Sequence, residues 1–171
     1  MESSEPTENH GGILLVCKQD ADKWINLQSF AARAVHLGVL DWDDAMRANV
    51  VVLIRDALET EVPSKDAGPS DHPALVRKYR LSVASHWIFQ CAEHLARDAR
   101  ASKINGTLQD LDVAVSGPSE LRIPLDTPGP LCMGRLHFWA RQLLKVGKEV
   151  RDKTVWKEAR MASKRLREVM Y

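Results

Sequence analysis

The segment Leu81-Ser-Val-Ala-Ser-His-Trp-Ile-Phe-Gln-Cys-Ala92 constrains the fold most strongly, because it is apolar on nearly every side of a helix. A helix of this kind is surrounded by other helices and does not lie on a surface. Asp71 is a good N-terminal cap, and Pro73 stands in the first turn, where a missing N–H is harmless. We therefore predict a long central helix from Asp71 to about Arg100, with the rest of the fold packed around it.

Four further helices are predicted from apolar residues at helical spacing and from signals at the helix ends. Asp41 is the expected N-cap of the second helix, and Gly147 is the expected break or kink between the last two. A short strand over 50–54 is the alternative within the second helix, because Val-Val-Val-Leu-Ile alone is typical of a strand. The sequence predicts an all-α, single-domain bundle of about five main helices, whose four outer members span about 20–36, 41–60, 131–146 and 148–170.

Two stretches fall outside these helices. Residues 1–12 are acidic and without an apolar core, so we expect a disordered tail in front of a single helical domain over 13–171. Residues 104–130 contain four prolines and form a long loop before the fourth helix. A loop of this length inside a compact domain is usually functional or disordered, and we interpret it as a candidate lid.

Composition excludes several classes of protein. A chain of 171 residues suits one domain. The net charge of +1 gives no support to general polyanion binding, so we expect no nucleic-acid partner. No apolar run reaches the roughly 20 residues that a membrane span needs. Three scattered cysteines without metal-site spacing, and no signal-peptide pattern at the N-terminus, predict a reducing, cytoplasmic location.

Basic residues gather at the C-terminal end, where ten lysines and arginines follow from Arg141 against four acidic residues. We interpret this excess as the solvated outer face of the last helix, with binding to nucleic acid or an acidic membrane as the alternative. Trp156 is expected to point inward with Ala159, which leaves no aromatic side chain among the basic residues.

Motifs for cofactors and metals are missing from the sequence. It contains no GxGxxG, no phosphate-binding loop, no GxSxG and no HExxH. His86 and His94 are two helical turns apart, about 12 Å, which is too far to share one metal ion. We expect no cofactor and no metal.

A line of polar side chains runs along the central helix. His86, Gln90 and His94 follow one another at intervals of four residues, and Ser82 lies one turn before them. Buried polar groups need partners, so this line either faces a small cavity or bonds to neighbouring helices and fixes their packing. Facing a cavity, His86 would serve as acid or base.

Other residues complete this candidate site. Arg55 forms an i, i+4 pair with Glu59, and Arg135 with His137 suits an anionic or phenolic oxygen. Structural contacts are the alternative for each. The candidate catalytic residues are His86, Gln90 and Arg55, and the candidate substrate-binding residues are Trp87, His94, Phe138, Trp139, His137, Arg33 and Asn49.

Three short stretches, Trp24-Ile-Asn-Leu-Gln-Ser-Phe-Ala-Ala-Arg33, Leu53-Ile-Arg-Asp-Ala-Leu-Glu59 and Arg135-Leu-His-Phe-Trp139, occur in this order. The chain thereby resembles a fungal family of small all-helical proteins, the domain of unknown function numbered 3632. That family tends to place its tryptophan directly after the arginine, whereas three residues separate Arg135 from Trp139 here. The resemblance implies a fungal protein of specialised metabolism, akin to the hetero-Diels–Alderases of tropolone–sesquiterpene biosynthesis.

Two hypotheses about function follow. The first is a cofactor-independent enzyme for a hydrophobic small molecule, which dehydrates it to a quinone methide and catalyses a (hetero-)Diels–Alder cyclisation, as the resemblance implies. The second is a non-catalytic helical protein-interaction module, favoured by the missing motifs. Either suits a homodimer, because aromatic helices can bury a face against a second copy.

Overall fold

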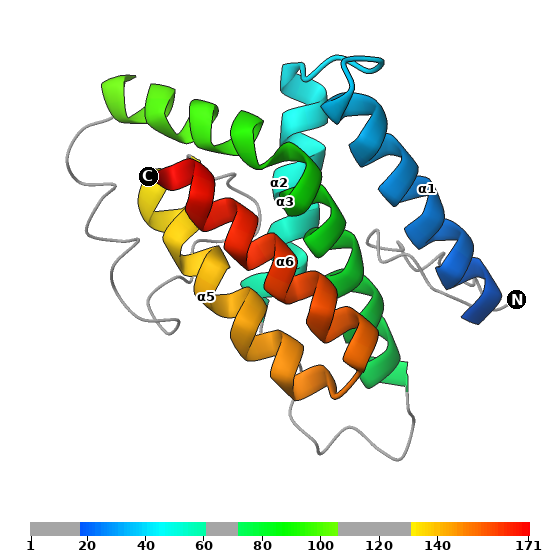
Figure 1. The fold of residues 1–171 in the computed structure, drawn as a ribbon. Coiled ribbons are helices and arrows are strands. Elements are labelled where there is room, and N and C mark those ends of the chain that lie inside the picture. The colour runs from blue at the N-terminus through cyan, green and yellow to red at the C-terminus, as the bar shows by residue number, and fades with distance from the viewer. Residues whose placement is uncertain (1–17, 61–71, 106–130) are drawn as a thin grey trace, which may run out of the picture.

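The computed structural model describes residues 18–60, 72–105 and 131–171 (Figure 1). These ranges form five helices, which confirms the predicted all-α, single-domain bundle. Three predicted features lie outside the described residues. They are the tail over 1–12, the cap at Asp71 and the proline-rich loop after its first residues. The helices are α1 (Lys18–His36), α2 (Asp44–Leu58), α3 (His72–Asn105), α5 (Met133–Val150) and α6 (Lys153–Met170).

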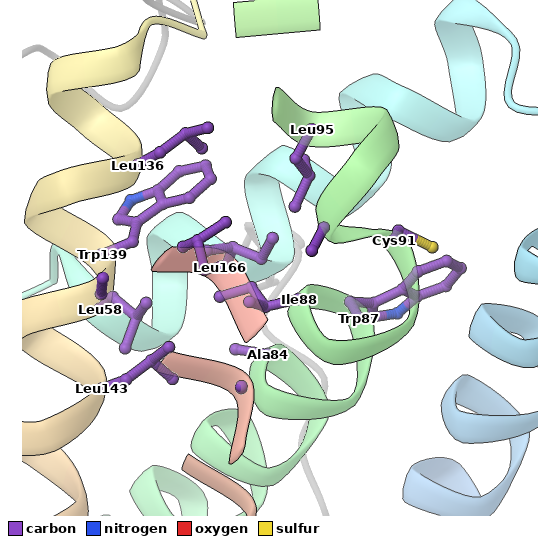
Figure 2. Packing of buried hydrophobic residues seen from close by; sticks show 14 of the residues in the cluster. Leu58, Ala84, Trp87, Ile88, Cys91, Leu95, Leu136, Trp139, Leu143 and Leu166 are labelled. Carbon is purple, nitrogen blue, oxygen red and sulfur yellow. The ribbon is translucent and has the colours of Figure 1, made fainter. Parts of the chain in front are cut away.

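Helix α3 is the centre of the bundle, as its apolar sequence predicts. It packs against each of the other four described helices, and α1 lies along its outer flank (Figure 1). Figure 2 shows Ala84 and Ile88 of α3 facing Leu166 of α6, with Trp139 of α5 close by. Ile88 and Leu166 are fully buried. Burying an aliphatic side chain of this size stabilises the fold by roughly 1.5–3 kcal/mol, so this interface holds the bundle together.

Cys91 interrupts the regular geometry of α3. Its backbone angles are φ −108° and ψ 17°, and the two halves of the helix meet there at a kink, where α3 changes direction (Figure 1). The thiol is buried near the Ala32 carbonyl of α1, with Sγ and O 3.8 Å apart. Burial raises the pKa of this thiol to about 12, so it behaves as a small apolar side chain.

Two helix ends differ from the prediction. Asp43, not Asp41, caps α2, because its Oδ1 accepts a hydrogen bond from the Met46 N–H at 2.7 Å. The break between the last two helices is not at Gly147: α5 continues to Val150, and Arg151 makes the turn with a left-handed φ of 55°. Residues 50–54 lie inside α2, so the strand alternative is wrong.

Gly147 instead permits the close approach of α5 and α6. A Cβ atom at this position would lie 2.8 Å from Cε3 of Trp156 and 3.2 Å from Cβ of Ala159. Trp156 therefore rests on α5 and is not fully inward as predicted, because its side chain stays partly exposed. The Lys148 ammonium lies 6.0 Å and the Arg160 guanidinium 5.9 Å from the centre of its ring. An aromatic side chain thus does stand among the basic residues.

None of the helices in the described ranges is both long and apolar enough to cross a membrane.

Candidate functional site

The polar line of α3 meets α6 at a single carboxylate. The Ser82 hydroxyl donates a hydrogen bond to Glu158 Oε2 at 2.7 Å, and His86 Nε2 lies 3.7 Å from Glu158 Oε1. The side chains of His86 and Glu158 are 25% and 26% exposed. Ser82, His86 and Glu158, here named the Glu158 cluster, therefore join two helices at a seam that solvent still reaches.

The remaining polar residues of α3 face other neighbours. Gln90 is half-buried one turn after His86. The indole N–H of Trp87 donates to Gln28 Oε1 of α1 at 2.8 Å, and this tryptophan is 2% exposed. Trp87 thus fastens α1 to α3, and its ring belongs to the core (Figure 2).

His94 lies beyond the kink and contacts the turn before α2. Its ring stacks on Trp42 with the centroids 5.2 Å apart, and its Nδ1 lies 3.1 Å from an Arg97 nitrogen. Burial, followed by the positive charge of Arg97, lowers the pKa of His94. The Trp42 N–H in turn donates to Asp98 Oδ2 at 2.7 Å. His94 is therefore a neutral packing partner near neutral pH.

The second constellation is a buried ion cluster between the end of α2 and the start of α5. Arg135 binds Glu59 through two parallel hydrogen bonds, Nε to Oε1 at 2.8 Å and a terminal nitrogen to Oε2 at 3.0 Å. Trp139 Nε1 donates to the same Oε1 at 2.6 Å, and Arg55 Nε lies 3.5 Å from Oε2. We name Arg55, Glu59, Arg135 and Trp139 the Glu59 cluster.

Water hardly reaches the Glu59 cluster. The side chains of Arg135, Arg55 and Glu59 are 3%, 5% and 7% exposed. Charge-assisted, two-point bonds between a guanidinium and a carboxylate are among the strongest protein hydrogen bonds. Nearby, burial raises the pKa of Asp56, against the opposing charges of Arg80 and Arg55. Because Glu59 is fully engaged by donors, the cluster can hold helices or orient an oxyanion, but its carboxylate is a poor general base.

The predicted site residues therefore do not gather in one place. Arg55 and Trp139 meet at the Glu59 cluster, whereas His86 lies at the seam between α3 and α6, and Gln90 is half-buried one turn further along α3. Trp87 and His94 face α1 and the turn before α2. Of the remaining predicted residues, Phe138 is in the core, His137 is half-buried with its ring centre 5.9 Å from that of Tyr171, and Arg33 and Asn49 are exposed.

Two carboxylates organise these groups, and the sequence interpretation gave neither a site role. Glu158 lies three residues after Val155 and four before Ala162, and both of these residues are buried. This helical spacing indicates that Glu158 lies beside the buried face of α6. Glu59 shares a helix face with Arg55, and Trp139 shares one with Arg135. No sequence signal, however, pairs the two faces, because they come from distant segments.

The family model for a protein of unknown function, DUF3632, matches residues 7–143. The chain belongs to the DUF3632 family. No curated protein and no solved structure matches it significantly. The Glu59 cluster lies wholly within the matched residues of this DUF3632 protein, whereas Glu158 lies beyond them. Two of the stretches that carried the resemblance, 53–59 and 135–139, meet in that cluster. The hydrogen bonds between them give a physical reason why both motifs occur in one chain.

Proposed function

We propose that this DUF3632 protein is a non-catalytic helical interaction module that binds protein chains through the outer face of α1. The observation that supports it best is apolar exposure on that helix: Leu27 and Phe30 are 61% and 68% exposed, and Leu37, directly after the helix, is 74% exposed. Phe30 and Leu37 are seven residues apart and share a face. Contiguous exposed apolar side chains mark interaction surfaces in soluble proteins.

The polar groups of α3 agree with this proposal. Ser82 and His86 are joined to Glu158 of α6, and Trp87 to Gln28 of α1. These side chains therefore have a structural use as links between helices, which keeps the bundle rigid and its outer faces in place.

A second copy of the chain is the partner that we expect on α1. Homodimer interfaces are more apolar than transient ones, and a two-fold interface presents the same patch from both subunits. Sedimentation or light scattering of the purified chain should give twice the mass of 19.2 kDa. Phe30→Glu should give the monomer mass, whereas Lys153→Glu, at an exposed position on α6, which does not pack against α1, should leave the dimer intact. A monomer for the unaltered chain at all concentrations would contradict the proposal.

A cofactor-independent enzyme of fungal specialised metabolism is the second candidate, and the Glu158 cluster favours it. An imidazole beside a carboxylate, both about one-quarter exposed, is an arrangement that general acid–base catalysis uses. In the reaction that the resemblance implies, the base removes a phenolic proton and the acid protonates the departing hydroxyl, which leaves as water. The resulting quinone methide then adds to an alkene in a (hetero-)Diels–Alder cyclisation, and holding both reactants together lowers the barrier.

Kinetics with His86→Gln and Glu158→Gln test this second candidate. The enzyme hypothesis predicts that the chain accelerates cyclisation of a hydroxybenzyl precursor with a polyene, and that His86→Gln reduces kcat by about a hundredfold or more without changing the fold. Equal product formation with the unaltered chain, the variant and buffer would reject it.

A further inference from the structure

An open groove lies along α6, and none of the residues that line it belongs to the Glu158 cluster or the Glu59 cluster. It has a volume of about 490 Å³. Its apolar surfaces come from Leu144 of α5 and from Trp156 and Met161 of α6, and Met161 is 45% exposed. The residues of α6 that line the groove run from Trp156 to Glu168. At a rise of 1.5 Å per residue, this distance is about 18 Å, or three helical turns.

Positive charge borders these apolar surfaces. Lys157, Arg160, Lys164 and Arg167 all line the groove. They follow one another at intervals of three, four and three residues, which places them in one stripe along α6. The one acidic residue of the lining, Glu168, lies 3.7 Å from Lys164 at the C-terminal end. The groove therefore presents an apolar strip beside a row of cations.

The construction of the groove is specific to the packing of α5 on α6. Trp156 fits against α5 only because Gly147 has no side chain, and the Lys148 ammonium and the Arg160 guanidinium each lie about 6 Å from the centre of its ring. An indole held in this way offers an apolar surface next to two cations.

We propose that this groove binds an acidic amphipathic helix of a partner protein. Such a helix places apolar side chains at i, i+3, i+4 and i+7, a span of about 10 Å, which fits within the length of the groove. Its flanking carboxylates repeat at the same helical interval as the four cations, as charges beside the seam of a coiled coil do. This second surface rests on the proposed interaction role and is independent of the dimer contact on α1.

The same features argue against a nucleic acid as the occupant. The phosphates of a nucleic acid pair with lysine and arginine but make no favourable contact with Leu144 and Met161. Stacking of a base requires a free indole face, whereas the Arg160 guanidinium lies over the Trp156 ring. An acidic helix uses both the charge and the apolar strip.

Binding of a synthetic peptide tests the proposal. The probe is a fluorescein-labelled peptide of three heptads with leucine at the first and fourth positions and glutamate at the fifth and seventh, and fluorescence anisotropy reports its Kd for the full chain. We expect a Kd on the order of micromolar at low salt. Lys157→Glu with Lys164→Glu should raise the Kd about tenfold or more, because attraction becomes repulsion at two positions. Met161→Ser should raise it several-fold through loss of apolar contact.

Matched controls make the result decisive. Lys153→Glu reverses an exposed charge on α6 outside the groove and should change the Kd less than about twofold. All of these positions are exposed, so the melting temperature checks that each variant folds. The proposal is overturned if the peptide does not bind, if a scrambled peptide of equal charge binds as tightly, or if a single-stranded RNA or phosphatidylserine vesicles compete at the groove more strongly. A failure of this proposal would not affect the proposed dimer, because the mass of the Phe30→Glu variant tests the dimer contact independently.

Discussion

Removing the carboxylate of Glu59 should destabilise the fold far more than removing any exposed carboxylate. Arg135 and Trp139 donate hydrogen bonds to Glu59, and Arg55 forms an ion pair with it, in a place where each charged side chain is no more than 7% exposed. Breaking a buried ion pair by deleting one partner typically costs about 3–5 kcal/mol, because the other charge stays buried. For a chain of this size, each kcal/mol shifts the melting temperature by about 2–4 °C, so Glu59→Ala should lower it by roughly 6–20 °C.

Chemical and thermal unfolding of three variants measure this effect. Glu59→Gln keeps the shape and one acceptor oxygen, and should cost about 1–3 kcal/mol. Glu93→Ala is the matched control, because Glu93 is 70% exposed and pairs with Arg165 on the surface, where such pairs contribute about 0–1 kcal/mol. If Glu59→Ala costs no more than Glu93→Ala, the cluster is not dry and our reading of its role is wrong.

Three further predictions concern single positions. Asp152 accepts hydrogen bonds from the Thr154 and Val155 N–H groups and pairs with Lys78. Asp152→Ala should therefore lower the free energy of unfolding by about 1–2 kcal/mol. Asp152→Asn keeps the helix cap and should lower it by less. The bond from Lys78 lowers the pKa of Asp152, so the ion pair stabilises the fold fully only above the unfolded pKa near 3.8. In acid titrations, the advantage over Asp152→Asn should decline as the pH falls below about 4 and be lost once the pH is below the lowered pKa of the folded state. Gly147→Ala should cost about 1–3 kcal/mol in denaturant unfolding, because its Cβ would meet the Trp156 ring at 2.8 Å; a neutral result would show that the ring moves freely. Cys91, with its pKa raised to about 12 by burial, should escape alkylation at pH 8 in the folded protein and react only on unfolding, as mass spectrometry of the peptides would show.

The fold was largely predictable because it follows from local apolar periodicity. The all-round apolar sequence of 81–92 required a central helix, and α3 does pack against every other described helix. Helix ends were less predictable, because Asp41, Asp43 and Asp44 are all acceptable caps and the sequence does not show that Asp43 accepts the Met46 N–H. Gly147 was misread as a break, since sequence alone does not distinguish a glycine that ends a helix from one that admits a neighbouring ring.

The candidate site was predictable only within single helices. The sequence paired Arg55 with Glu59 and Arg135 with His137, whereas the contacts of Arg135 and Trp139 with Glu59 depend on how α2 packs against α5. Likewise, the line from Ser82 to His86 was visible, whereas its partner Glu158 comes from a segment 72 or more residues away. Interactions between distant segments carry no local pattern, so the sequence left open whether these polar groups face a cavity or another helix.

Site-specific photo-crosslinking in the cells that make this protein tests the interaction role most directly. A benzophenone amino acid in place of Phe30 keeps an aromatic ring on the outer face of α1, and the same amino acid at Ala45, an exposed position on α2, is the control. We predict a covalent dimer, at twice 19.2 kDa, from position 30 and none from position 45. Uncrosslinked chain alone at position 30, or equal crosslinking at both positions, would contradict the account.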